Sequence, residues 1–471
     1  MSYQDVKDAA VRGVVSKGLD LVLHSVRGKD RDKSYSNMIN LVEKLMGDTF
    51  PAFVFEDFRT HILNPDDKWR QFLDSTIDET DPHVLKMHLL NAGYQAGFHG
   101  YTKTGEYGKT HDCRLPWIIL VDPTSACNKH CIGCWSAEYG NKLNLTFEEL
   151  DDLITQGEKL GIFFYMMTGG EPLMRQKDII KLCEKHPKSM FYAFTNGTLI
   201  TEKLCEDMQR VGNFALCLSV EGFEEENDAR RGEGSFEQAV SKMQMLRDHG
   251  LIFGTSICYT SKNYETVTSD EFLDFLIDKG VKYSWYFHYM PVGNDANPDL
   301  MCTPEQREYM VNRIREVRDW NGGKPIFLMD FQNDAEFVGG CIAGGKYYAH
   351  INPNGDVEPC VFIHYSNANI RDMSLEDALT QPLFKAYQKA QPFNQNSFMP
   401  CPMLENPEKL GKLVAATGAV STDLESPEST EHLAEKTRPY AACWGQCADR
   451  LAAANPHAIR EPAGELPDGT H

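Results

Sequence analysis

The sequence predicts an α/β protein: a partial (β/α)6 barrel of the TIM type, preceded by a helical region and followed by a small irregular α+β domain. Between residues 115 and 330, short apolar runs alternate with amphipathic helical segments, as parallel strands and their crossover helices do. Residues 1–110 show mainly helical periodicity, and after about residue 335 Pro, Asn and Cys become frequent. We therefore expect three regions: 1–110, 111–335 and 336–471.

Composition narrows the class of protein. The 471 residues include 47 Lys and Arg against 68 Asp and Glu, a formal charge of −21, and 42% are hydrophobic. These are proportions of a folded globular chain, and the acidic balance argues against broad nucleic-acid binding. The sequence contains no run of about 18 apolar residues that would span a membrane. It also opens with no basic and apolar leader, so we expect a cytoplasmic protein.

The first region contains a stretch with two alternative roles. In segment 7–33, apolar residues at helical spacing such as Val11, Val14 and Val15 accompany seven Lys and Arg residues. A basic amphipathic helix can lie on an anionic membrane surface. Four aspartates dilute the positive charge, so a helix packed on the barrel is the favoured interpretation.

The pattern of the barrel region predicts six or seven βα units in succession. The first helix is marked by a capping box, because Thr146 is followed three residues later by Glu149. Active residues of such a barrel lie at the carboxyl ends of its strands. Strands are expected at 117–121, 162–167, 189–194, 214–220, 252–258, 283–289 and 325–329, and helices at 146–161, 176–186, 201–211, 235–249, 269–279 and 304–320.

The last region predicts a β-hairpin followed by irregular chain. Residues 347–351 and 357–363 read as two strands that turn at Asn354-Gly355, a dipeptide typical of tight hairpin turns. Residues 421–440 and the tail beyond 455 are polar, and we expect them to be loosely held.

Cysteine spacing gives the strongest chemical signal. The motif Cys127-Asn-Lys-His-Cys131-Ile-Gly-Cys134 directly follows the first predicted barrel strand. Clustered thiols in a reducing compartment are typical of metal centres, and thiolates are the usual ligands of iron–sulfur clusters. Three ligands on a four-iron cluster leave one iron open for catalysis. The alternatives are a structural zinc site with His130, or a chance grouping. Six scattered cysteines are interpreted as core packing: Cys113, Cys183, Cys205, Cys217, Cys258 and Cys302.

A second motif, Thr168-Gly-Gly-Glu-Pro172, follows the second predicted strand. Its glycines allow the backbone to approach a ligand closely, and Glu171 can pair with an ammonium group. By itself such a segment is an ordinary βα loop. Because this segment lies one βα unit after the thiol motif, it becomes a specific signal.

Together the two motifs resemble the radical S-adenosylmethionine (SAM) superfamily over roughly residues 115–330. The resemblance implies that Cys127, Cys131 and Cys134 are catalytic and hold a [4Fe–4S] cluster whose open iron chelates SAM. It implies that reductive cleavage of SAM yields a 5′-deoxyadenosyl radical that abstracts hydrogen from substrate. It further implies cofactor contacts from the second motif and later strand ends, at Gly169, Gly170, Glu171, Pro172, Asn196, Ser219, Glu221 and Arg230. The sequence departs at Gly133, where an aromatic residue is frequent in the family; Trp135 is nearby.

The C-terminal cysteines resemble the auxiliary-cluster domain called SPASM, or its shorter form, twitch. Cys341, Gly355 and Cys360 match the opening of that domain, and Cys401, Cys443 and Cys447 follow. A full SPASM domain has seven cysteines, whereas five are available here. The resemblance therefore implies one auxiliary [4Fe–4S] cluster held by four of the five, the alternative being unrelated thiols.

The resemblance implies an enzyme that modifies an unknown substrate, and a peptide or protein side chain is the expected class. A low-potential donor such as flavodoxin or ferredoxin would supply the electron. Two alternatives remain open: radical modification of lipid acyl chains at a membrane surface, and a non-catalytic iron–sulfur carrier or sensor. His288, Tyr289, His350 and His364 flank predicted strand ends, where a packed, hydrogen-bonded side chain is the commoner role.

Overall fold

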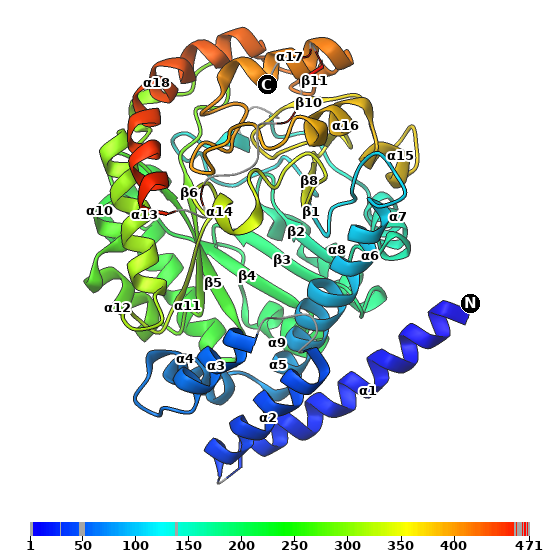
Figure 1. Cartoon of the computed structure of the whole chain (residues 1–471), viewed down its shortest axis with the longest axis vertical. Coiled ribbons are helices and arrows are strands. Elements are labelled where there is room, and N and C mark those ends of the chain that lie inside the picture. The colour runs from blue at the N-terminus through cyan, green and yellow to red at the C-terminus, as the bar shows by residue number, and fades with distance from the viewer. Residues whose placement is uncertain are drawn as a thin grey trace.

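The computed structural model describes residues 3–28, 30–46, 52–136, 140–455, 458, 464, 466–467 and 469. In Figure 1 the strands of one central sheet run through the middle of the molecule, the N-terminal helices lie below it, and the C-terminal elements lie above it. This arrangement confirms the predicted α/β class.

The central sheet has the order β7-β6-β5-β4-β3-β2-β1-β8-β9. Strands β1 to β8 pair in parallel, and β9 pairs antiparallel with β8. Each of the seven predicted barrel strands is present. The strands are β1 (Ile118–Val121), β2 (Phe164–Met167), β3 (Met190–Thr195), β4 (Phe214–Ser219), β5 (Phe253–Tyr259), β6 (Tyr283–His288), β7 (Phe327–Asp330), β8 (Tyr348–Ile351) and β9 (Val357–Glu358).

The predicted hairpin is present, but it belongs to the barrel sheet. Ile118 of β1 pairs with Tyr348 of β8, and Val121 pairs with Ile351. The hairpin therefore continues the parallel sheet beyond β1, instead of standing apart in a C-terminal domain. This placement brings the start of the last region beside the thiol motif that follows β1.

The connecting helices agree with the sequence pattern, with one addition. Both hydrogen bonds of the predicted capping box are present. The Thr146 hydroxyl accepts the N–H of Glu149, and the Glu149 carboxylate accepts the N–H of Thr146. A further helix, α10 (Glu224–Arg231), was not predicted, because its sequence has no apolar periodicity. Its three leading glutamates and two final arginines match the helix dipole. The other barrel helices are α7 (Phe147–Leu160), α8 (Gln176–Lys185), α9 (Glu202–Val211), α11 (Ser235–Asp248), α12 (Asp270–Asp278) and α13 (Pro304–Arg318), with short turns η3 (Pro172–Arg175), η4 (Thr266–Thr268) and η5 (Pro298–Leu300).

The N-terminal helices contact the loops that enter the strands. The N–H of Asp81 donates to the carbonyl of Gly250, just before β5. The guanidinium of Arg12 in α1 donates to Gln95 in η1 and to the carbonyl of Leu90, so this basic residue packs against the fold. No helix among the described residues is long and apolar enough to cross a membrane. These elements are α1 (Tyr3–Val26), α2 (Arg31–Met46), α3 (Ala52–Ile62), α4 (Lys68–Glu79), α5 (Pro82–His88), η1 (Leu89–Gly100) and α6 (Tyr101–Tyr107).

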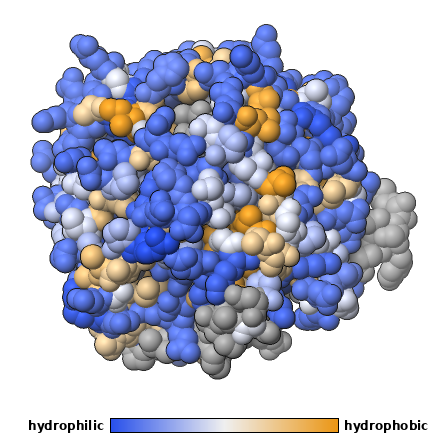
Figure 2. Space-filling model, turned by 90° about the horizontal axis from the view of Figure 1, so that it is seen from above, coloured by the Kyte–Doolittle hydropathy of each residue, from blue (hydrophilic) through white to orange (hydrophobic). Residues whose placement is uncertain are grey.

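The C-terminal elements form a second hydrophobic core over the carboxyl ends of the strands. Its centre includes Phe398, Met403 and the fully buried Trp444. The expectation that residues 421–440 are loosely held is wrong for 430–440, which begin helix α18 and bury Tyr440. Seen from above, this side is mainly hydrophilic, with small separate hydrophobic spots (Figure 2). The elements are α14 (Ala335–Val338), β10 (Tyr365–Ser366), α15 (Leu375–Leu379), α16 (Pro382–Lys389), α17 (Pro407–Thr417), β11 (Val420–Ser421) and α18 (Thr430–Ala454).

Candidate functional site

A cavity open to solvent lies at the carboxyl ends of the barrel strands. Both sequence motifs reach it, although they belong to different loops. The predicted site residues that line the cavity are Cys127, Cys131, Cys134, Gly169, Gly170, Glu171, Asn196, Ser219 and Arg230.

The two motif loops are hydrogen bonded to each other. The N–H of Gly170 donates to the carbonyl of Thr124 at 3.0 Å, and the N–H of Glu171 donates to that of Ala126 at 2.8 Å. A Cβ atom on Gly170 would lie 2.2 Å from the carbonyl oxygen of Ala126. Only glycine therefore allows the second loop to lie this close to the chain that leads into Cys127.

The structure explains why glycine, and not an aromatic residue, precedes the third cysteine of the thiol motif. Gly133 has a φ of +68°, and a Cβ there would lie 2.5 Å from the ring of Tyr289. No larger side chain fits between the loop and that tyrosine. Trp135, one residue beyond Cys134, is an aromatic of this loop that lines the cavity.

Glu171 is a buried anchor of the second loop. Its carboxylate accepts hydrogen bonds from the hydroxyl of Thr195 at 2.7 Å, the N–H of Asn196 at 2.8 Å and the N–H of Leu173 at 3.0 Å. Burial raises the pKa of this carboxyl group, although the three donors act against the rise. Pro172 begins η3 and is buried, and it is not among the residues that line the cavity. Glu171 thus joins the loops after β2 and β3 at the edge of the cavity.

Glu221 holds two arginines that line the cavity. Its fully buried carboxylate forms ion pairs with Arg230 and Arg231 of α10 and accepts the N–H of Cys258 at 2.9 Å. Arg231 Nη1 lies 3.9 Å from the sulfur of Cys131. Glu221 therefore positions the guanidinium groups, and the arginines line the cavity.

Sequence reasoning missed several cavity residues. Cys258, interpreted as core packing, lines the cavity at the end of β5. His288 also lines it and is fully buried, and neither ring nitrogen has a hydrogen-bond partner. Burial, together with the nearby Arg307, lowers the pKa of His288 well below the ordinary value, so the imidazole is neutral. Their positions at strand ends were the available signal, but strand ends also hold many packed side chains.

A buried ion network joins the barrel to the C-terminal hairpin. The imidazole of His350 lies 3.1 Å from the carboxylate of Asp122 and 2.6 Å from that of Glu358. The hydroxyl of Thr168 donates to Asp122 at 2.5 Å. Burial disfavours charge on His350, but the two carboxylates outweigh it and raise its pKa to about 10. His350 is thus a paired structural cation, and His364 lies 3.5 Å from the other oxygen of Glu358.

A second, smaller cavity is lined by three of the C-terminal cysteines. Cys341, Cys360 and Cys401 come from three separate loops and all line it. The hydroxyl of Tyr348 donates to the sulfur of Cys360 at 2.6 Å, and that of Tyr387 lies 3.3 Å from the sulfur of Cys341. The structure therefore brings together three of the five predicted thiols, not four.

The other two C-terminal cysteines lie elsewhere on α18. Cys443 is exposed to solvent. Cys447 is buried and accepts a hydrogen bond from Arg450 at 3.1 Å, and Arg450 pairs with Glu308 of α13. Neither cysteine lines the second cavity.

Two family models match the chain at these two sites. The model of the Radical SAM superfamily matches residues 121–276, and the model of the iron–sulfur cluster-binding domain SPASM matches residues 341–403. The first range contains both motif loops. The chain contains a radical SAM domain followed by a SPASM domain. The SPASM range contains Cys341, Cys360 and Cys401 and ends before Cys443.

Curated relatives are similar over about half to two thirds of the chain. Mycofactocin maturase MftC of Mycolicibacterium smegmatis is 27% identical over 52% of this chain and 64% of its own length. AdoMet-dependent heme synthase of Methanosarcina barkeri is 23% identical over 63% of this chain and 86% of its own. The subtilosin biosynthesis protein AlbA of Bacillus subtilis is 24% identical over 64% and 67%, respectively.

Solved structures share the fold. Streptococcus suis SuiB bound to S-adenosylmethionine superposes with a TM-score of 0.51 at 18% identity, over 62% of this chain and 72% of SuiB. The complex of SuiB with precursor peptide SuiA gives 0.52 at 17% identity, over 62% and 71%. Both superpositions support the partial barrel.

The radical SAM domain implies SAM and a [4Fe–4S] cluster, and the SPASM domain implies further iron–sulfur centres. The donor chemistry fits, because the three motif thiols and Cys258 line the first cavity, three thiols line the second, and thiolates are the usual cluster ligands. Among the described residues, no three His, Cys, Asp or Glu side chains are arranged to hold a single metal ion.

Proposed function

We propose that this radical SAM enzyme reductively cleaves S-adenosylmethionine at the first cavity and abstracts hydrogen from a peptide or protein side chain. The observation that carries the proposal is the hydrogen-bonded contact between the thiol loop and the Gly169–Gly170 turn at one cavity. When bound, the cluster and SAM supply an electron and a 5′-deoxyadenosyl radical.

The chain's residues have distinct roles in this proposal. Cys127, Cys131 and Cys134 hold the cluster, and the glycines keep the second loop beside it. Glu171 keeps Asn196 and the second loop in place through its hydrogen bonds, and Ser219 adds a polar contact at the end of β4. The guanidinium of Arg230 is suited to a carboxylate such as that of SAM, because its planar donors match one.

The substrate end of the cavity is aromatic and holds one buried imidazole. Phe287, Phe331 and Phe362 line it with His288 and Tyr289. Such a wall packs against a side chain, and the neutral His288 can accept a hydrogen bond from it. SuiB, which shares the fold, has been crystallised with a precursor peptide, and this supports a peptide substrate here. A flavodoxin or ferredoxin in the cytoplasm is the proposed electron donor.

The two alternatives have less support. The relatives are named maturases and heme synthases, which are enzymes and not electron carriers. For the lipid alternative, Arg12 of the basic stretch is engaged with η1 instead of facing outward, although Val14 and Leu21 on α1 are exposed. We therefore retain the peptide proposal.

The test is anaerobic reconstitution with iron and sulfide, followed by SAM, dithionite and chromatography for 5′-deoxyadenosine. We expect product from the wild type and none from Cys131→Ala. The control is Cys443→Ala, whose thiol is exposed and lines neither cavity, and it should retain wild-type yield. Product from Cys131→Ala, or none from fully reconstituted wild type, would contradict the proposal.

A further inference from the structure

We propose that Cys258 is a hydrogen-atom donor: its thiol returns hydrogen to the substrate carbon radical in the first cavity, so that the substrate exchanges one carbon-bound hydrogen for hydrogen drawn from solvent. The inference rests on the proposed function, which supplies the radical. It assigns a role to a cavity thiol that belongs to neither sequence motif.

The geometry of β5 and β6 places the thiol of Cys258 in the cavity. Successive side chains of a strand point to opposite faces. On β5, Ser256 and Cys258 both line the cavity, whereas Ile257 between them is fully buried in the main hydrophobic core. On β6, Phe287 is the register partner of Cys258, and both Phe287 and Tyr289 line the cavity. Cys258 therefore faces the barrel interior beside two aromatic side chains.

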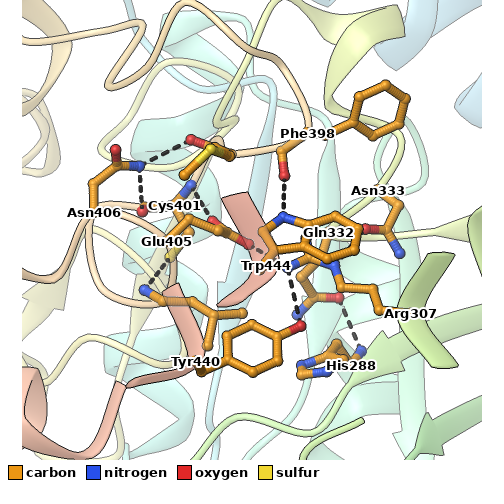
Figure 3. A network of polar contacts seen from close by, with 12 residues as sticks. His288, Arg307, Gln332, Asn333, Phe398, Cys401, Glu405, Asn406, Tyr440 and Trp444 are labelled. Carbon is orange, nitrogen blue, oxygen red and sulfur yellow. Dashed lines mark hydrogen bonds and ion pairs between the residues drawn. The ribbon is translucent and has the colours of Figure 1, made fainter. Parts of the chain in front are cut away.

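The opposite face of the end of β5 is held by the buried polar network of Figure 3. In that network Arg307 pairs with Glu405 at 2.7 Å, and the same carboxylate accepts the N–H of Cys401 at 2.7 Å. Arg307 also donates to Asn333 at 2.8 Å, and Asn333 donates to the hydroxyl of Tyr259 at 3.0 Å. Because Tyr259 directly follows the cavity thiol, this network fixes the strand end that carries it.

The backbone and the charges around Cys258 keep a protonated thiol in place. Its N–H donates to Glu221 at 2.9 Å, and its carbonyl accepts the side-chain amide of Asn263 at 3.2 Å. Burial raises the pKa of the Cys258 thiol to about 11, although Arg230 acts against the rise. The sulfur therefore carries its hydrogen at neutral pH, as a hydrogen-atom donor must.

Tyr289 provides a second observation that points to a ligand beside this thiol. Its side chain is 1% exposed, and its hydroxyl has no hydrogen-bond partner within the described part of the chain. Burial and the neighbouring Cys258 raise the pKa of this hydroxyl, so it is a neutral donor and acceptor. A buried hydroxyl without a partner is costly unless a ligand supplies one. We therefore place a polar group of the substrate at Tyr289, which brings a neighbouring substrate carbon to Cys258.

The proposed transfer is balanced in atoms and electrons. The substrate hydrogen leaves in 5′-deoxyadenosine. The S–H bond of Cys258 then breaks as a C–H bond forms at the substrate carbon, and this leaves a thiyl radical; the step is favourable because an S–H bond is weaker than an aliphatic C–H bond. One electron from the flavodoxin or ferredoxin donor and one proton from solvent restore the thiol. The substrate is neither oxidised nor reduced, and a carbon that receives hydrogen on its opposite face is inverted.

The test needs no peptide, because in its absence the 5′-deoxyadenosyl radical is itself the carbon radical in the cavity. Reconstituted protein is equilibrated in deuterium oxide and given SAM and dithionite, and the 5′-deoxyadenosine is analysed by mass spectrometry. Thiol hydrogens exchange with solvent, whereas carbon-bound hydrogens do not. We expect most of the wild-type product to carry one deuterium. Cys258→Ser and Cys258→Ala should each lose most of this label, since a hydroxyl or methyl hydrogen is not a donor of this kind.

Cys217→Ser is the matched control, because Cys217 is a buried thiol on the neighbouring strand β4 that does not line the cavity. It should keep the wild-type label, and so should Tyr289→Phe, which removes the other exchangeable hydrogen beside Cys258. Labelling is measured per molecule of product, so a slower or partly unfolded variant does not alter it. Equal labelling of wild type and the Cys258 variants, or loss of label in Tyr289→Phe, would overturn the assignment. Unlabelled wild-type product would refute this inference alone, whereas no product from wild type would refute the proposed function and this inference with it.

Discussion

Replacing Gly170 with Ala tests the contact on which the proposed chemistry depends. The added Cβ would lie 2.2 Å from the Ala126 carbonyl oxygen and 2.6 Å from that of Ser125. Since non-bonded heavy atoms prefer about 3.5 Å, the two loops must separate by about 1 Å. Gly170 does not have positive φ, so the substitution tests this close approach and not backbone conformation.

The expected magnitudes follow from that displacement. The change weakens the hydrogen bonds from Gly170 to Thr124 and from Glu171 to Ala126. At about 0.5–1.5 kcal/mol for each bond, the free energy of unfolding should fall by about 1–3 kcal/mol. A misplacement of about 1 Å at a reacting centre costs about 100-fold in rate, so formation of 5′-deoxyadenosine should slow by that order.

The assay compares Gly170→Ala with Gly322→Ala in denaturant unfolding, iron content and 5′-deoxyadenosine formation. Gly322 has no atom within 4 Å of its added Cβ and no positive φ, so this control should behave as wild type. If Gly170→Ala retained wild-type rate and stability, the loops would not be in the tight contact described, and the reasoning would be refuted.

Three further predictions concern the buried polar groups. Glu405→Gln leaves the buried Arg307 without its carboxylate, so the free energy of unfolding should fall by about 3–5 kcal/mol, and a denaturant curve that matches wild type would contradict the role of the pair. Tyr348→Phe removes the hydrogen bond to Cys360 and should lower the reduction potential of the auxiliary cluster while iron content stays constant; an unchanged potential in a spectroscopic redox titration would count against ligation by Cys360. Burial acts against charge on His350, but Asp122 and Glu358 raise its pKa to about 10, so its stabilising charge is complete below about pH 6.5 and is lost as the pH rises through 10. The unfolding free energy of wild type should therefore decline across that window more steeply than that of His350→Gln, and parallel pH profiles would disprove it.

Local sequence signals were sufficient for most of the fold and for the first half of the site. Buried parallel strands are continuous apolar runs, which is why each barrel strand was recognisable in the chain. Capping is equally local, as the Thr146–Glu149 pair shows. The two motifs were visible because the chemistry of each is concentrated within a few consecutive residues that follow neighbouring strands. Helix α10 was not predicted because its sequence lacks apolar periodicity, and its two arginines pair with Glu221, which lies outside the helix.

Contacts between distant segments were decided by the tertiary structure alone. Sequence spacing does not show that β8 pairs with β1, or that Cys258 and His288 line the first cavity. Nor does it show that three C-terminal thiols line the second cavity while two lie elsewhere. Those outcomes depend on how whole elements pack: burial of Tyr440 and Trp444 sets the rotation of α18, and the Arg307–Glu405 pair places the Cys401 loop. The amino-acid sequence by itself determined the elements and the two motif loops, because their information is local. Only the packed molecule determined which side chains share a cavity, because that depends on burial and charge pairing between segments far apart in the chain.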